Sequence, residues 1–191
     1  MLDKNFFASL KERYHAHERG RREVIGLSAA AQSASKRAIF ASHRDDSSGA
    51  DRLLSEAADA LKKVRTLFDG RAELADEGSY RAALEEYAEA KLYARYLASG
   101  DVGALDDENI DYEIYLGGLS DLTGELVRRQ MRAATDGNLD QVRKIKDMVE
   151  EIVVQLMDMD LTGYLRNKFD QAKNSLRRAE EVLYEVTLRR G

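Results

Sequence analysis

The stretch DRLLSEAADALKKVRTLF, residues 51–68, carries the pattern that decides the fold. Its apolar side chains recur every three or four residues, which is the spacing of one face of an α-helix. These positions are Leu53, Leu54, Ala57, Leu61, Val64 and Leu67. A strand would instead alternate apolar and polar residues, so the stretch predicts an amphipathic helix.

The same spacing continues on both sides of this stretch. We predict six helices with approximate bounds 2–42, 51–68, 79–99, 109–135, 139–158 and 162–188. Ser48 is a candidate N-cap for the second of them. Proline, which breaks helices, is absent from all 191 residues. Nothing divides the chain, so we expect a single domain over residues 1–191, an all-α bundle of about six to seven long helices.

Charge and composition exclude several classes of protein. The net charge is −5, from 30 basic and 35 acidic residues, so any RNA site must be a local basic patch. Cysteine is absent, which excludes disulfides, thiolate zinc sites and a cysteine nucleophile. No window offers the roughly 20 apolar residues of a membrane span, and the N-terminus becomes charged too early for a signal peptide. We therefore expect a cytoplasmic protein with no membrane partner.

Four carboxylates form two pairs with helical spacing. Glu86 and Glu89 lie three residues apart in the third predicted helix, and Asp121 and Glu125 lie four apart in the fourth. Residues at these spacings share a helix face. Facing helices that each offer two carboxylates can hold a metal ion between them, and Mg²⁺ prefers such oxygen ligands.

The alternative is that these are ordinary surface acids. An acid in a charge-rich helix often has a basic neighbour three or four residues away, but of the four only Glu125 has such neighbours, Arg128 and Arg129. Uncompensated acids on two helices destabilise the fold unless a cation or another helix neutralises them. From the residues alone, both interpretations stay open.

Three glycines, Gly117, Gly118 and Gly124, surround Asp121 inside an apolar helical pattern. Each one costs a helix interior roughly 1 kcal/mol relative to alanine. Close packing against another helix would explain them, and so would close approach of a ligand to the acids. The pattern does not separate these two explanations.

Four separated segments, in the right order, resemble the translin family and in particular its TRAX branch (translin-associated factor X). The strongest is YLGGLSDLTGEL, residues 115–126, and the second is EYAEA, residues 86–90. The third is SKRAIF, residues 35–40, followed by His43-Arg44. The fourth comprises positions matched in the last helix: Lys168, Lys173, Ser175, Leu176, Glu180, Tyr184 and Arg190-Gly191. The resemblance covers nearly the whole chain from Arg22 onward.

The resemblance implies a bundle of about seven helices, hollow octamers, and binding of single-stranded RNA or DNA. The Mg²⁺-dependent ribonuclease residues of TRAX fall on Glu86, Glu89, Asp121 and Glu125. Translin itself lacks the full set, so this chain sides with the catalytic branch, although it is shorter between the third and fourth helices. We expect an endoribonuclease for single-stranded or processed RNA, with Mg²⁺ as cofactor and Mn²⁺ as a substitute. The expected assembly is a homo-oligomer, an octamer, or a hetero-oligomer with a translin-like subunit.

Basic residues near these segments are candidates for RNA contacts: Lys36, Arg37, Arg128 and Arg132. The last two continue the face of the second acidic pair at helical spacing and could contact phosphates. Pairing of Arg128 with Glu125, and a solvated charged face at Lys36 and Arg37, are the alternatives.

Two other functions remain open. One is a non-catalytic binder of single-stranded RNA or DNA of the translin type, in which the acids are structural. The other is an all-α, Mg²⁺-dependent nucleotide pyrophosphatase, which also pairs acidic motifs on two helices. Its second motif usually has a glutamate–x–x–aspartate spacing, which is absent at Asp121 and Glu125.

Overall fold

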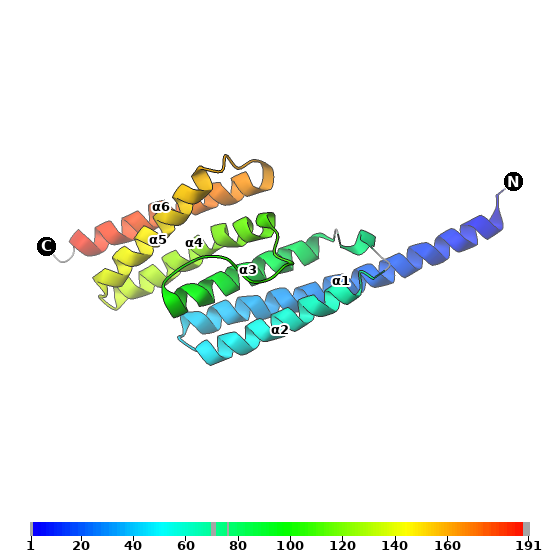
Figure 1. The fold of residues 1–191 in the computed structure, drawn as a ribbon, viewed down its shortest axis with the longest axis horizontal. Coiled ribbons are helices and arrows are strands. Elements are labelled where there is room, and N and C mark those ends of the chain that lie inside the picture. Colours follow the sequence, from blue (N-terminus) through cyan, green and yellow to red (C-terminus); the bar gives the residue numbers. More distant parts are fainter. Residues whose placement is uncertain (1, 70–71, 76, 189–191) are drawn as a thin grey trace.

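The computed structural model describes residues 2–69, 72–75 and 77–188, and this part of the chain contains helices and no strand. The elements are α1 (Lys4–His43), α2 (Ser47–Thr66), a short 3₁₀ helix η1 (Ala72–Leu74), α3 (Gly78–Ser99), α4 (Tyr112–Thr135), α5 (Leu139–Met157) and α6 (Gly163–Leu188) (Figure 1). The prediction of an all-α helical bundle is confirmed. Arg190-Gly191, matched above in the last helix, lie outside the described residues.

The break between α1 and α2 differs from the prediction in where α2 begins, at Ser47 rather than near residue 51, and in its cap. Asp46, rather than Ser48, caps α2, and its carboxylate accepts a hydrogen bond from the backbone N–H of Gly49 at 2.9 Å. Ser48 already lies inside the helix, so the prediction for it was wrong. Aspartate and serine cap helices about equally well, and here the aspartate comes first along the chain.

Helices α3 and α4 occupy the middle of the bundle (Figure 1). On one side α3 packs against α1 and α2, and on the other α4 packs against α5 and α6. The two predicted acidic pairs therefore lie on adjacent central helices. Helices α1 and α6 flank this central pair and can supply side chains to it from either side.

A close approach of backbones holds α3 and α4 together at Gly118. A Cβ atom at this position would lie 2.9 Å from the backbone nitrogen of Glu89 and 3.0 Å from the carbonyl oxygen of Glu85. Only glycine permits this approach without moving one helix. Close helix packing therefore accounts for Gly118.

The first part of α1 projects beyond the rest of the bundle (Figure 1). It exposes several large apolar side chains, among them Phe6, Leu10 and Tyr14. Within the described ranges, no helix has the run of apolar residues that crossing a bilayer requires.

Candidate active site

The two pairs of acids come together between the central helices. Burial, together with the negative charges of Asp121, Glu86 and Glu125, raises the pKa of Glu89 to about 9. Burial also raises the pKa of Glu86, and the charges of Asp121 and Glu125 act in the same direction. The carboxylates on α4 thus raise the pKa of those on α3, as expected when like charges share a site.

Three of the four acids contact a nitrogen-bearing side chain on a different helix. The Nζ atom of Lys36 on α1 lies 3.4 Å from Oε2 of Glu86. On α6, Nζ of Lys168 lies 2.5 Å from Oδ2 of Asp121. The basic neighbours that the acids lack within their own helices are therefore partly supplied by packing.

Glu125 is the third of these acids, and its Oε2 atom contacts Nε2 of His43 at the end of α1. Arg128, on the same helix as Glu125, lies 3.7 Å from the same oxygen. The expected alternative of an Arg128–Glu125 pair is therefore present in the structure.

One oxygen of Glu86 and one oxygen of Glu125 remain available. The hydrogen bonds and ion pairs of the described residues use Oε2 of Glu86 and Oε2 of Glu125, but not Oε1 of either carboxylate. Asp121 contacts Lys168 through Oδ2 and also interacts with the carboxyl group of Glu85. The carboxylate of Glu89 takes part in no such contact with a described residue, and this side chain is only 8% exposed.

The described residues contain no preformed metal site. No three of their His, Asp or Glu side chains already lie in an arrangement that could hold a metal ion. The donor set itself suits Mg²⁺, because it consists of hard carboxylate oxygens, and both oxygens of Glu89 and one each of Glu86 and Glu125 have no hydrogen bond or ion pair with a described residue. A cation would also relieve the repulsion among the acids. Metal binding would require the four side chains to move toward one another.

Two residues next to the site, Glu85 and Lys168, were not predicted as site residues from the sequence. Glu85 accepts hydrogen bonds from the hydroxyl of Tyr164, at 2.6 and 2.9 Å to its two oxygens, and lies 2.6 Å from Nζ of Lys168. Lys168 therefore bridges Glu85 and Asp121. The spacing of Glu85, four residues before Glu89, was the available signal, because it puts both acids on one face.

The glycines beside Asp121 have different surroundings. A Cβ atom at Gly117 would collide with the carboxylate of Glu85, whereas one at Gly124 would meet nothing within 4 Å. Gly124 is exposed and lies between Asp121 and Glu125 in the chain. Helix packing therefore does not explain Gly124, which leaves an open surface beside the acids.

The predicted RNA contacts have different partners in the structure. Arg128 lies over the ring of Phe40, 4.8 Å from its centroid, and Phe40 is itself exposed. Arg37 is exposed and makes no hydrogen bond or ion pair with another described residue. Lys36, at Glu86, lies on the same helix as Arg37 and Phe40. Lys36 and Arg128 thus lie beside the acids, with Phe40 next to Arg128, and Arg37 adds an exposed cation on the same helix as Lys36 and Phe40.

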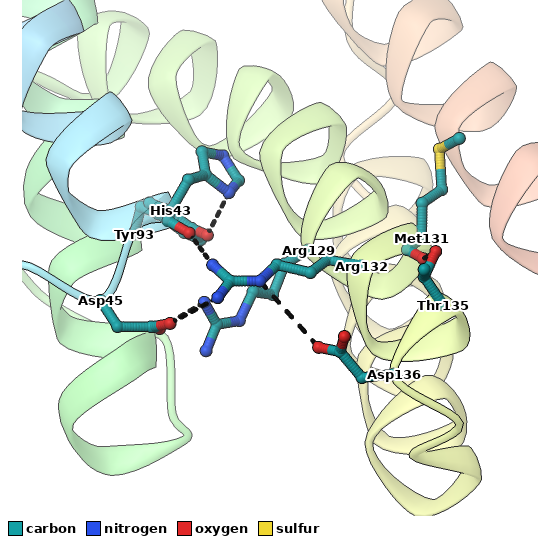
Figure 2. Close-up of polar contacts among 8 residues, drawn as sticks. All are labelled: His43, Asp45, Tyr93, Arg129, Met131, Arg132, Thr135 and Asp136. Atoms are coloured by element: carbon teal, nitrogen blue, oxygen red, sulfur yellow. Dashed lines mark hydrogen bonds and ion pairs between the residues drawn. The ribbon is translucent and has the colours of Figure 1, made fainter.

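Arg132 instead contacts the turn between α1 and α2 (Figure 2). Its guanidinium donates to the backbone carbonyl of His43 and lies 2.8 Å from the carboxylate of Asp45, with Asp136 at 4.0 Å. Arg129 holds the same Asp45 at 2.7 Å. These contacts tie the turn to α4, and a contact of Arg132 with RNA stays a prediction.

This arrangement of helices is similar to that of known structures. The chain is similar to the crystal structure of apo-NeC3PO, with a TM-score of 0.85, 24% identity, and coverage of 97% of this chain and 98% of that chain. It is similar to AfC3PO in a complex with duplex RNA (TM-score 0.84, 20% identity, 96% and 97% covered) and to the crystal structure of AfC3PO (0.85, 20%, 96% and 98%). At these identities the likeness shows the fold.

Sequence comparison identifies the family. No curated protein matches the chain. The family model described as Translin family matches residues 19–190, which is most of the sequence. The chain therefore belongs to the Translin family.

Proposed function

We propose that this protein is a Mg²⁺-dependent endoribonuclease of the TRAX type that cuts single-stranded or processed RNA. The observation that carries the proposal is the electrostatic coupling of Glu89 and Glu86 on α3 to Asp121 and Glu125 on α4. Acids whose pKa is raised by burial and by carboxylates on a second element are typical of functional sites. The TRAX resemblance assigns the same four positions.

The four acids would hold the metal ion, or a pair of ions, through their carboxylate oxygens. Bound Mg²⁺ would polarise the scissile phosphate and lower the pKa of an attacking water. At neutral pH Glu89 carries a proton, because its pKa is about 9, and it must release this proton to serve as a ligand. No side-chain nucleophile is required.

The surface formed by Lys36, Arg37, Phe40 and Arg128 would guide RNA to the acids. Cationic side chains neutralise phosphates, and an exposed ring such as Phe40 offers a base a stacking partner. The structural neighbour AfC3PO is described in a complex with duplex RNA, so duplex substrates belong in the test beside single strands. Single-stranded DNA is a second ligand for the same surface.

We further propose that the chain acts as an oligomer, as a homo-octamer or together with a translin-like subunit. The exposed apolar side chains of the projecting part of α1 are consistent with burial in an assembly. A cytoplasmic location agrees with the absence of cysteine from the sequence.

A non-catalytic nucleic-acid binder is the second candidate. It is favoured by Lys36, Lys168 and His43, which already contact one oxygen of Glu86, Asp121 and Glu125 in turn. In that case the acids hold helices together and the basic surface alone binds RNA.

Cleavage of labelled RNA separates the two candidates. Single-stranded RNA, duplex RNA and a nucleoside triphosphate are each incubated with the protein in EDTA, Mg²⁺ or Mn²⁺. We expect metal-dependent cutting inside the single strand, abolished in Glu89→Gln and Asp121→Asn. Glu56→Gln is the matched control, since Glu56 is an exposed acid on α2 paired with Arg52.

Retention of RNA binding and helicity by the two site variants would confirm that only catalysis is lost. If Glu89→Gln and Asp121→Asn cut RNA at the normal rate, the ribonuclease assignment is wrong. Hydrolysis of the triphosphate in place of RNA would favour the pyrophosphatase.

A further inference from the structure

His43 is a buried histidine that the chemistry above does not use. It is the last residue of α1 and is 8% exposed, and its ring packs against that of Tyr93 on α3, with centroids 4.9 Å apart. Tyr93 is completely buried. The two rings thus lie in the interior next to Glu125.

When the imidazole is neutral, the hydrogen bonds of this pair have one consistent direction. An ionised carboxylate can only accept, so Nε2–H of His43 donates to Oε2 of Glu125. In a neutral imidazole Nδ1 is then an acceptor, and it receives the O–H of Tyr93 at 3.0 Å. Every polar atom of the two side chains is satisfied in this tautomer. The hydroxyl of Tyr93 therefore determines which nitrogen of His43 faces the acid.

The backbone of His43 is fixed by the helix that carries Glu125. Its carbonyl oxygen accepts from Arg132, and Arg132 and Arg129 together hold Asp45, two residues further along the chain (Figure 2). Asp45 has a φ of 61°, a left-handed conformation that costs energy in a residue other than glycine. The turn is thus held in place from α4, and His43 is tied to α4 through both its ring and its main chain.

We propose that His43, backed by Tyr93, is a positioning residue that holds Glu125 in the orientation needed to bind the metal ion. The hydrogen bond occupies Oε2 and leaves Oε1 free of protein partners in the described chain. Replacing a residue that hydrogen-bonds to a metal ligand commonly lowers metal affinity or activity 10- to 100-fold. The inference rests on the proposed function, because it assigns Glu125 to the metal.

The first measurement needs neither metal nor activity. Long-range ¹H–¹⁵N spectra of the metal-free protein report the tautomer of each histidine, and the chain has only three histidines. We expect His43 as the Nε2–H tautomer, and Tyr93→Phe should shift its Nδ1 resonance. A predominant Nδ1–H tautomer in the unmodified protein would overturn the proposal.

The second measurement compares variants in Mn²⁺ binding and RNA cleavage. Tyr93→Phe removes one hydroxyl and keeps the ring, and His43→Leu removes the donor to Glu125. His43→Gln keeps an N–H group near the position of Nε2 and should recover part of the loss. Tyr96→Phe is the matched control, since Tyr96 is a half-buried tyrosine on the same helix with no side-chain hydrogen bond to a described residue.

We expect Tyr93→Phe and His43→Leu to weaken Mn²⁺ binding and lower kcat roughly 10-fold or more, with the KM for RNA changed less than twofold. Circular dichroism should remain native for Tyr93→Phe and Tyr96→Phe. If the variants lose stability but keep wild-type Mn²⁺ affinity and kcat, the role of the pair is only structural and the proposal fails. A wild-type protein that binds Mn²⁺ yet cuts no RNA would refute the ribonuclease function. The Mn²⁺ affinities of the variants would then decide alone whether His43 and Tyr93 position Glu125.

Discussion

Glu89 is the most buried of the four acids, and its shifted pKa links folding to pH. The unfolded chain releases this proton near the ordinary value of 4.5, whereas the folded protein holds it until about 9. Between these values the folded state binds more protons, so this residue's contribution to stability is complete below pH 4.5 and is lost as the pH rises toward 9.

Glu89→Gln should therefore stabilise the metal-free protein at pH 8, by about 1–3 kcal/mol, and much less at pH 5. Urea unfolding in EDTA at both pH values measures this difference. Mg²⁺ should raise the stability of the wild type at pH 8 and have little effect on the variant. An equal effect of the substitution at pH 5 and pH 8 would show that Glu89 is ionised in the folded protein.

Arg37 is the most suitable residue for testing whether the surface formed by Lys36, Arg37, Phe40 and Arg128 binds RNA. It is exposed, and its replacement removes no ion pair with a described residue. Arg37→Gln should weaken RNA binding and reduce the slope of log K against log salt by about one. Fluorescence anisotropy of labelled RNA over a range of KCl concentrations, in EDTA, measures this slope.

Arg143→Gln is the matched control, since Arg143 is an exposed arginine on α5, away from α1 and α3. Equal salt slopes for the two variants would mean that RNA binds elsewhere.

At the scale of helices, the contact between α3 and α4 decides whether the acids can meet. It depends on Gly118, where a Cβ atom would run into the backbone of α3. Gly124 lies on the same helix but faces open space. The two glycines therefore form a natural pair for comparison.

Gly118→Ala should lower the free energy of unfolding by about 1–3 kcal/mol, since the helices must move apart. Gly124→Ala should raise it by up to about 1 kcal/mol, because alanine favours the helix and meets no neighbour. Thermal unfolding followed by circular dichroism measures both. A loss of stability in Gly124→Ala as large as that in Gly118→Ala would contradict the packing explanation.

At the scale of the whole molecule, the projecting part of α1 exposes apolar residues that the rest of its own bundle leaves uncovered (Figure 1). An assembly would bury them. Size-exclusion chromatography with light scattering should give a mass several times 21.5 kDa, and an octamer would give eight times that mass. A strict monomer at micromolar concentration would refute the oligomer proposal.

Net charge also belongs to this scale. With a net charge of −5, the molecule as a whole repels nucleic acid, and RNA binding must come from the local surface around Lys36, Arg37 and Arg128. Because only these few cationic side chains can contact phosphates, the slope of log K against log salt should be shallow.

The helices and the shared face of each acidic pair could be predicted from the sequence alone. Both are local properties: apolar spacing sets a helix, and a separation of three or four residues aligns side chains whatever lies around them. The same local reasoning was too coarse for the cap of α2, because Asp46 and Ser48 are both competent caps two residues apart.

The partners of the acids could not be predicted in this way. His43 and Glu125 are 82 residues apart, and Lys168 and Asp121 are 47 apart. Their contacts depend on which helices pack together, and helical periodicity within one element carries no information about its neighbours. Glu86 and Asp121, which have no basic neighbour on their own helices, thus acquire Lys36 and Lys168 from α1 and α6. Glu125 acquires His43 in the same way, because only tertiary packing places α1 and α6 beside α3 and α4.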